Sequence, residues 1–336
     1  MNPYKLHSDI SLTGLPRVVV MVGRNNTGKS SIVQAVALPK YGHSWSPSFP
    51  TAPTTDLGLT VSPLSRIELE YDGPNSTLEV VTAANGDGSL DTRVTWRGAT
   101  VASSRSIPRP TDSTTSEGPL LGAPDDSKRV FVLGAFREAP PRAFAYAQFT
   151  RDIGTNGENC WNAIHQLKAD DSPVFKDIQD TLGGLGFGSG GIRTPTTGAG
   201  SGLTRLENYG RVDELGFVGS GTSSVLPIVT QGALCLPGET LIVEEPELHL
   251  HRQTINSLWQ FFGKLAERNV QVILTTHSTD LVASLRTQTD EGKVPNDYRV
   301  YVVKREATGL TSVESQPLDY FRKAIDAIKD ELRGLP

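Results

Sequence analysis

Residues 23–30, with the sequence GRNNTGKS, place two glycines, a lysine and a serine in the pattern G-x-x-x-x-G-K-S. An apolar run, Val18–Val22, precedes them, and a helical pattern, Lys29–Leu38, follows them and stops at Pro39. In such a strand-turn-helix loop, backbone N–H groups converge on phosphate oxygens, the lysine reaches the β- and γ-phosphates, and the serine ligates magnesium. The stretch therefore predicts a nucleotide-phosphate cradle, and the alternative is a plain glycine turn.

Two adjacent carboxylates end a second apolar strand, predicted over residues 240–245 in the sequence TLIVEE. The carboxyl ends of strands in an α/β sheet border the ligand crevice. There Glu244 can hold magnesium through water while Glu245 polarises the attacking water of an in-line displacement. The alternative is a solvated acidic strand end.

The same stretch permits a rival chemistry. Glu245, Glu247, His249 and His251 alternate, and on one face of a strand they could serve as transition-metal ligands. Pro246 interrupts that strand directly after the acid pair, which weakens the metal hypothesis.

His277 ends a third apolar strand, predicted over residues 270–277, and follows Glu245 by 32 positions. A histidine beside a nucleotide can donate a hydrogen bond to the γ-phosphate and sense its loss. A histidine at a strand end is often incidental, but its order after the phosphate loop and the acid pair favours a functional role.

The segments between these motifs predict the elements that position them. RIELEY (66–71), TLEVV (77–81) and TRVTW (92–96) alternate apolar and polar residues and predict an antiparallel meander with one wet face. Residues 40–65 and 97–128 are rich in Ser, Thr, Pro and Gly and predict loops, so an antiparallel insertion region spans about 40–128.

Further elements follow along the chain. Residues 182–202 contain nine glycines, whose backbone entropy predicts a flexible loop or hinge. The remaining predictions are strands over 129–136 and 298–303, helices over 158–167 and 253–268, and an apolar helical stripe over 318–332 that packs on its own domain or on a partner.

The composition bears on the kinds of partner and on the cellular location that the sequence predicts. The chain has 336 residues, of which 37% are hydrophobic and 21% charged, and a formal net charge of -5. This charge gives no support to nucleic-acid binding, although it does not exclude a local basic groove. Cys160 and Cys235 lack metal or disulfide spacing, and no apolar run has the length of a signal peptide or membrane span, so we expect a cytoplasmic protein.

Together, GRNNTGKSS, LIVEEPELHLH and ILTTHS resemble the Walker A, the Walker B with D-loop, and the H-loop of ABC-type ATPases. They are most similar to the SMC-like branch that includes the OLD (overcoming lysogenization defect) family and bacterial "AAA family" proteins of phage-defence operons. Weaker similarities lie in FVLGAFREAPPR (131–142), DIGTNGEN (152–159) and GFVGSGTSSVLPIV (216–229). The resemblance runs from about residue 15 to 305 and implies a single ABC-type ATPase domain over 1–336, an α/β P-loop NTPase with a mixed central sheet and a β-meander lobe.

The resemblance also implies site residues. Glu245 becomes the catalytic carboxylate and His277 the switch histidine. Ser30 and Glu244 would bind magnesium, and the phosphate loop would bind ATP in the same subunit. In a second subunit, Ser220 and Gly221 of the signature region close over that ATP. The implied nucleotide-binding residues are Gly23, Asn26, Thr27, Gly28, Lys29, Ser30, Ser31, Ser220 and Gly221.

Several departures from the family pattern limit what is carried over. Glu244 stands where most ABC ATPases have Asp, and no LSGGQ is present, so the signature register can be off by a residue. No Q-loop glutamine is clear, and Gln148 is the candidate. Arg137 and Arg142 could approach the nucleotide or a partner, or be plain surface arginines.

The leading function is an ATPase that forms a homodimer or higher homo-oligomer around ATP and drives a separately encoded effector, a nuclease or toxin, in anti-phage defence. A TOPRIM nuclease in the same chain is not expected, because the 59 residues after His277 contain no convincing Asp/Glu cluster. The alternatives are an ATP-locked scaffold or sensor for a toxin or phage protein, and an ATPase of DNA repair or processing. A transporter subunit would need the missing LSGGQ and Q-loop.

Overall fold

The structure, a computed structural model, describes residues 10, 12, 14–36, 64–70, 77–84, 90–96, 99–106, 130–137, 141, 143–187, 191–198, 200–208, 211–214, 219–292, 297–306 and 311–316. The expected apolar stripe over 318–332 and Arg142 lie outside these residues.

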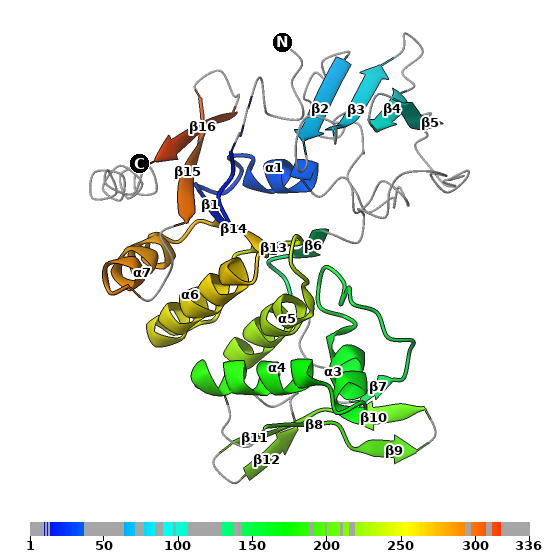
Figure 1. Cartoon of the computed structure of the whole chain (residues 1–336), viewed down its shortest axis with the longest axis vertical. Helices are drawn as coiled ribbons and strands as arrows, with labels where there is room; N and C mark the ends of the chain where they lie inside the picture. Colours follow the sequence, from blue (N-terminus) through cyan, green and yellow to red (C-terminus); the bar gives the residue numbers. More distant parts are fainter. Residues whose placement is uncertain are drawn as a thin grey trace. The chain divides into compact units, whose positions relative to one another are not determined.

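A six-stranded sheet with the order β16-β15-β1-β14-β13-β6 carries the strands predicted around the motifs (Figure 1). Its members are β1 (Val18–Val22), β6 (Val130–Leu133), β13 (Thr240–Glu244), β14 (Gln271–Thr276), β15 (Tyr298–Arg305) and β16 (Thr311–Gln316). β14 pairs in parallel with β1 and β13, and β1 also pairs in parallel with β15. Strands buried on both faces read as continuous apolar runs, as the fully buried VVVMV of β1 does.

The helices are α1 (Lys29–Val36), α3 (Cys160–Ala169), α4 (Pro173–Gly184), α5 (Ser220–Leu234), α6 (Arg252–Glu267) and α7 (Thr279–Asp290). α5, α6 and α7 lie side by side in Figure 1, and α5 and α6 pack on the sheet through β13, β14 and β1. α6 turns one apolar stripe inward, which fully buries Trp259 and Phe262. Burial of a side chain of this size stabilises a fold by about 3 kcal/mol.

Gly232 allows α5 to approach α6 closely. A Cβ at this position would lie 2.5 Å from the Phe261 ring and 2.9 Å from a Leu265 methyl carbon. Because real Cβ atoms do not come this close to other heavy atoms, any side chain here would displace the Phe261 ring and the Leu265 methyl group or push the two helices apart. The packing of α6 side chains against α5 therefore uses the space that this glycine leaves.

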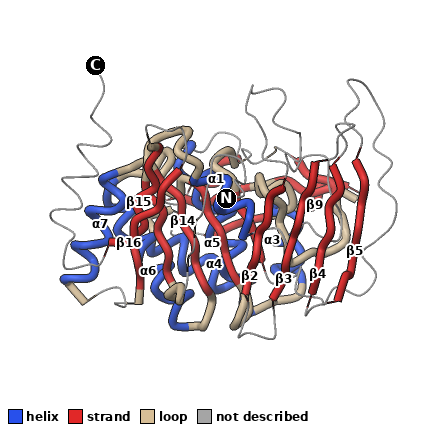
Figure 2. Tube along the Cα trace, turned by 90° about the horizontal axis from the view of Figure 1, so that it is seen from above, coloured by secondary structure: helices blue, strands red, loops and turns tan. Residues whose placement is uncertain are grey.

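The predicted meander is present and has one strand more than expected. Figure 2 shows its strands beside one another. It is an antiparallel sheet of β2 (Leu64–Glu70), β3 (Thr77–Ala84), β4 (Leu90–Trp96) and β5 (Ala99–Ser106), in that order. β5 falls where the sequence predicts a loop. Its residues ATVASSRS are small and polar, so they lack the large apolar alternation that marks a strand, and pairing with β4 supplies the stabilisation instead.

The glycine-rich segment 182–202 differs from its prediction as well. It contains the end of α4 and the short strands β8 (Gly191–Arg193), β9 (Thr196–Gly198) and β10 (Ser201–Leu203). They join two small sheets, β7-β10-β9 and β12-β11-β8, with β7 (Ala143–Ala145), β11 (Arg205–Asn208) and β12 (Arg211–Glu214). Gly191 and Gly200 have φ values of 92° and 88°, so these glycines supply left-handed backbone at the strand start and the turn.

The chain divides into two compact units. Residues 1–13, 25–130 and 303–314 make the first unit, and residues 14–24, 131–302 and 315–336 make the second. A single ATPase domain over the whole chain stays a prediction. Within the described residues, no helix has the length and apolar character that a membrane span requires.

Candidate functional site

The carboxyl ends of three parallel strands meet at one edge of the sheet, inside the second unit. β1 and β13 lie on either side of β14, with Val22 opposite Thr276 and Glu244 opposite Thr275. The next residue of each outer strand is tied to β14 too: the Gly23 amide donates to the Thr276 carbonyl at 3.2 Å, and the Glu245 amide to the Thr275 carbonyl at 2.8 Å. Consecutive carbonyls of one strand thus hold the start of the phosphate loop and the second acid.

The phosphate loop adopts left-handed backbone at Asn26, with φ 63°, and at Gly28, with φ 101°. Such residues turn successive N–H groups toward one side of the chain, which forms an anion-binding concavity. α1 begins at Lys29, and the Ile32 amide donates to the Gly28 carbonyl at 3.2 Å in its first turn. Lys29 is buried, whereas Ser30 is exposed.

Thr27 and Ser31 complete the predicted phosphate-binding residues. Thr27 is buried, and its carbonyl accepts a 2.6 Å hydrogen bond from the Thr311 hydroxyl of β16. Ser31 follows Ser30 in α1. The loop is therefore anchored in the first unit by a strand that lies 284 residues further along the chain.

Glu245 holds a strained backbone directly after β13. Its φ of 46° is left-handed, a conformation that costs a residue other than glycine about 1–3 kcal/mol. Pro246 follows, so the chain turns away from the strand at this point. Strain of this kind persists only where neighbouring groups over-determine the conformation, which directs attention to the contacts of Glu245.

His277 binds the carboxylate of Glu245. Its ring Nδ1 lies 2.6 Å from Glu245 Oε2, and its backbone amide donates to the same oxygen at 3.3 Å. The imidazole is half-exposed, whereas the carboxylate is largely buried. The two residues proposed from sequence as catalytic base and switch histidine therefore contact each other directly.

Glu247 is a third acid at this edge that the sequence interpretation did not use for hydrolysis. Its carboxylate accepts a hydrogen bond from the Thr276 hydroxyl, and its other oxygen is buried without a hydrogen-bond partner in the described part of the chain. Burial, with a smaller contribution from the nearby charge of Glu245, raises the pKa of Glu247 to about 7 against the lowering effect of the Thr276 hydroxyl. Glu247 therefore binds a proton more readily than an ordinary glutamate.

This shift predicts a pH-dependent stability. The folded-state pKa of Glu247 lies above the usual value of 4.5, so its protonation contributes stability below about pH 4.5 that is lost as the pH rises through about 7. Glu247→Gln, which stays neutral, should gain up to about 3 kcal/mol of unfolding free energy relative to the wild type between pH 5 and 8. Urea unfolding of the full chain across this range measures the difference.

Gln253→Ala, at an exposed position of α6 with no ionisable group, is the control, and its stability difference from the wild type should not change with pH. Parallel pH profiles for Glu247→Gln and the wild type would contradict an elevated pKa at Glu247.

Arg137 reaches this edge from the turn after β6. Its guanidinium donates to the backbone carbonyls of Glu244 and Glu245, each at 3.0 Å, and to that of Gly134 at 2.8 Å. Burial lowers the pKa of Arg137 to about 10, although Glu247 and Glu245 raise it, so the side chain stays charged at neutral pH. The sequence interpretation proposed Arg137 for the nucleotide or a partner and missed its contacts with the acid strand.

Ser220 and Gly221 form the start of α5, with Gly219 as the N-cap. Ser220 is exposed, and a Cβ on Gly221 would lie 3.1 Å from the carbonyl oxygen of His249. The N-terminus of α5, where helix N–H groups lack partners within the helix, therefore passes beside the segment that follows the acid pair. This is the position that the predicted signature region takes in the fold.

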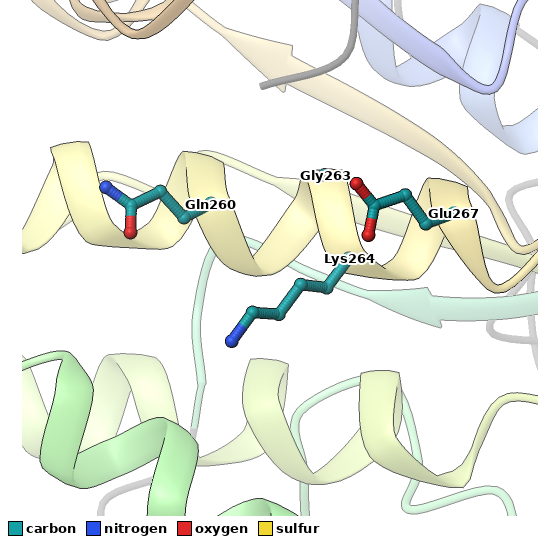
Figure 3. A pocket seen from close by; sticks show the side chains of 4 residues that line it. All are labelled: Gln260, Gly263, Lys264 and Glu267. Carbon is teal, nitrogen blue, oxygen red and sulfur yellow. The ribbon is translucent and has the colours of Figure 1, made fainter. Parts of the chain in front are cut away.

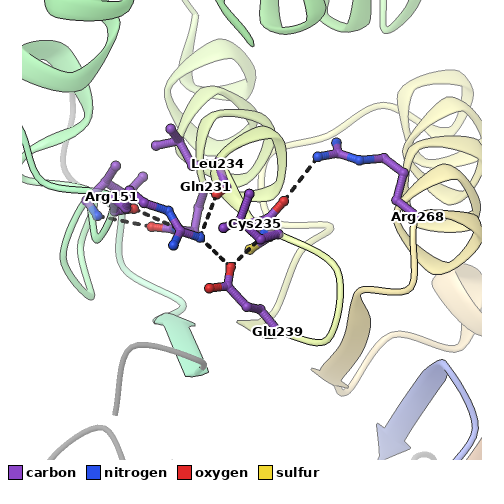
Figure 4. A network of polar contacts seen from close by, with 8 residues as sticks. Arg151, Gln231, Leu234, Cys235, Glu239 and Arg268 are labelled. Atoms are coloured by element: carbon purple, nitrogen blue, oxygen red, sulfur yellow. Dashed lines mark hydrogen bonds and ion pairs between the residues drawn. The ribbon is translucent and has the colours of Figure 1, made fainter. Parts of the chain in front are cut away.

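A polar network ties the segment before α3 to α5 and to the start of β13 (Figure 4). Arg151 binds Glu239 at 2.5 Å and the Leu234 carbonyl at 3.0 Å. Gln231 accepts from the Ile153 amide and donates to the Arg151 carbonyl, each at 3.0 Å. Arg268 also joins by donating to the Cys235 carbonyl at 3.0 Å. The network therefore ties Arg151 and Ile153, at the start of the DIGTNGEN segment (152–159), to α5.

Two further features lie away from the strand ends. A hollow of about 290 Å³ on one face of α6 is lined by Gln260, Gly263, Lys264 and Glu267, in the half of the helix next to the start of β14 (Figure 3). Gln148, the Q-loop candidate, is exposed, and its carbonyl accepts a 3.3 Å hydrogen bond from Asn162. Neither feature contacts the residues gathered around Glu245.

The alternative metal hypothesis fails in its original form. β13 ends at Glu244, and a turn replaces the strand that would have aligned Glu247, His249 and His251 on one face. Among the residues that the structure describes, the potential ligands that come within 4.8 Å of one another are Glu245, Glu247 and His277. Hydrogen bonds between Glu245 and His277, and between Thr276 and Glu247, already connect these groups.

Comparison with known proteins places this geometry in a wider context. The family described as "AAA domain, putative AbiEii toxin, Type IV TA system" matches residues 133–283, just under half of the chain. No curated protein matches the chain in sequence.

Solved structures match almost the whole chain. An SMC head bound to the C-winged helix domain of ScpA has a TM-score of 0.57 at 14% identity and covers 91% of each chain. The SMC head domain from Thermotoga maritima has a TM-score of 0.52 at 13% identity, covering 93% of this chain and 95% of its own. The Smc head domain bound to the C-terminal domain of ScpA from Pyrococcus furiosus has a TM-score of 0.52 at 12% identity, covering 93% of both.

These similarities confirm the predicted fold class. The chain has the α/β fold of ABC-type, SMC-like P-loop ATPases, with a mixed central sheet and an antiparallel β-meander.

Proposed function

We propose that this protein binds and hydrolyses ATP, and that two copies close around the nucleotide to drive or license a separately encoded effector, a nuclease or toxin, in anti-phage defence. The observation that carries the proposal is the joint anchoring of Gly23 and Glu245 on successive carbonyls of β14, directly before His277. Phosphate-binding and acidic groups at the carboxyl ends of parallel strands of one sheet are an arrangement suited to phosphoryl transfer.

The residues divide the work of hydrolysis. The left-handed loop at Asn26 and Gly28, with the N-terminus of α1, binds phosphate oxygens, and Lys29 adds a positive charge. The carboxylate of Glu245 accepts the proton of the attacking water. His277 already fixes this carboxylate, so little reorganisation is needed before reaction.

Magnesium fits the oxygen donors available, because the Ser30 hydroxyl and the Glu244 carboxylate are the hard ligands that this ion prefers. When bound, magnesium neutralises charge on the phosphate oxygens. Glu244, where an Asp is usual in the family it resembles, would hold this ion through its carboxylate.

Dimer closure is supported by the exposed start of α5. Its N–H groups and the Ser220 hydroxyl are suited to bind the γ-phosphate of ATP held by another subunit. ATP then favours the closed state through contacts that the open state lacks, and hydrolysis reopens it. Two of the similar SMC heads are bound to a domain of ScpA, which supports a separate partner protein here. We expect the ATPase and its effector to interact in the cytoplasm.

Ser220→Arg tests the contact in trans. A bulky cation at the start of α5 should block closure and lower ATP turnover roughly 30-fold, the effect of losing an interface contact of about 2 kcal/mol. Mixing this variant with Lys29→Ala should restore turnover, because one composite site of the mixed dimer then has an intact phosphate loop and an intact signature. ATPase rates of the separate and mixed proteins measure this.

Thr287→Arg, at an exposed position of α7, is the matched control and should keep wild-type turnover. If the mixture stays as inactive as its parts while mixed dimers form, Ser220 does not act in trans.

The overall proposal is tested by purifying the full chain with the products of adjacent genes, with and without ATP and magnesium. Light scattering should detect an ATP-dependent dimer, phosphate release should detect turnover, and the effector should co-purify. An ATP-dependent dimer without turnover would favour the scaffold or sensor alternative. A chain that stays monomeric and inactive with every nucleotide and partner would refute the proposal.

A further inference from the structure

Arg137 forms a fork around the Cα atom of Glu245. Nη1 donates to the carbonyl of Glu244, on the N-terminal side of this Cα, and Nη2 donates to the carbonyl of Glu245, on its C-terminal side. Nη1 also donates to the Gly134 carbonyl, which fixes the guanidinium to the turn after β6. The planar fork of arginine can hold two carbonyls at once in this way, and a lysine ammonium cannot reproduce its fixed geometry.

The fork acts where the backbone is strained. The orientation of the two carbonyls around a Cα follows from the φ and ψ angles of that residue, and Glu245 has the left-handed φ of 46°. The Glu245 amide is held separately by the Thr275 carbonyl. Arg137 and β14 together therefore hold every backbone polar group next to this Cα.

The side chain of Glu245 depends on this backbone. In a right-handed or extended conformation, the Cα–Cβ bond would point in another direction, and the carboxylate would leave the Nδ1 and amide of His277. Both terminal nitrogens of Arg137 donate to backbone carbonyls within the protein. These contacts favour a positioning role for Arg137 over the direct nucleotide contact considered from sequence.

We infer that Arg137 is the positioning residue of the hydrolytic site: it holds Glu245 in the left-handed conformation that aims its carboxylate at the attacking water. This inference rests on the proposed ATP hydrolysis. Arg137 acts through Glu245 and touches neither the water nor the nucleotide.

The test replaces Arg137 by Met, which keeps the length but removes the fork, and by Lys, which keeps the charge. Loss of a residue that orients a reacting group typically lowers activity 10–100-fold. Arg137→Met should lower kcat by roughly this factor, and Arg137→Lys should give an intermediate value. The Kd for a fluorescent ATP analogue should stay within about twofold of wild type, because the phosphate loop is unchanged.

Arg151→Met is the matched control. Arg151 also binds a backbone carbonyl and a carboxylate, but this carboxylate belongs to Glu239 and lies just before the start of β13, not at its end. This variant should lose thermal stability and keep the wild-type kcat. If Arg137→Met fails to fold, Arg137→Lys carries the same test.

Two readouts separate the possible failures. Hydrogen exchange of peptides covering residues 243–250 should rise in Arg137→Met and not in Arg151→Met, whether or not the protein turns over ATP. In a Glu245→Gln background, loss of Arg137 should lower the residual rate no further, because both act in one step. Unchanged exchange, an unchanged kcat in a folded variant, or a raised Kd with unchanged kcat would each overturn the inference. A wild type without turnover refutes the proposed function and leaves the exchange measurement to decide on Arg137.

Discussion

Glu245→Gln should lower the turnover of ATP by roughly 10²–10⁴-fold while leaving ATP binding intact, because an amide cannot accept the proton of the attacking water. Gln keeps the size of Glu and can still accept a hydrogen bond from His277, whose ring lies 2.6 Å from the carboxylate in the wild type. The closed dimer should therefore form with ATP and persist. Phosphate release and light scattering after ATP addition measure the two effects.

The dimer lifetime distinguishes Glu245 from a residue that only stabilises the fold. A destabilised protein would lose binding, dimer and turnover together, whereas loss of the base alone lengthens the life of the ATP-bound dimer. Wild-type turnover in Glu245→Gln would remove Glu245 from the mechanism. Unaltered function in cells, together with lost hydrolysis, would favour the scaffold alternative.

Lys29→Ala should weaken ATP binding by roughly 10- to 100-fold, and turnover at low ATP by at least the same factor. Charge-assisted hydrogen bonds to phosphate contribute about 1.5–3 kcal/mol each, and this lysine is 7% exposed at the start of α1. Titration with a fluorescent ATP analogue gives the Kd. ATP-dependent dimerisation should disappear at the concentrations that saturate the wild type.

Lys264→Ala is the matched control, because Lys264 is an exposed lysine of α6 that lines the hollow rather than the phosphate loop. It should bind ATP like the wild type. Equal affinities for Lys29→Ala and Lys264→Ala would contradict the phosphate-cradle interpretation of residues 23–30.

The sequence predicted the fold class and the strands that carry the motifs because each of these strands is a short, almost wholly apolar run. β1, β13 and β14 read as buried strands, and the amphipathic stripe of α6 reads as a helix. The acid pair and His277 were each predicted at the end of a strand, and the parallel pairing of β13 with β14 brings these ends to one edge of the sheet.

Other elements carry weaker local signals. β8, β9 and β10 are too short for a periodic pattern, and their pairing depends on strands elsewhere in the chain. α4 was missed although Ser172 caps it and Pro173 begins it, a start signal that sequence alone displays.

The contacts of Arg137 could not be predicted, because they join positions 107 and 108 residues apart through backbone carbonyls, which every residue possesses. The left-handed conformation of Glu245 likewise depends on its neighbours in space. The residue types at positions 244–247 suggested chemistry, but only the fold shows which groups hold them.

The place of β1 in the sheet has a consequence for biosynthesis. Both of its neighbours, β14 and β15, begin at residues 271 and 298, so β1 leaves the ribosome with no strand to pair with. At a translation rate of about 5–20 residues per second, it waits roughly 10–50 s for β14. During that interval a wholly apolar strand depends on chaperones or on transient contacts to avoid aggregation. The ribosome thus synthesises the phosphate loop long before it synthesises β14, the strand that anchors Gly23.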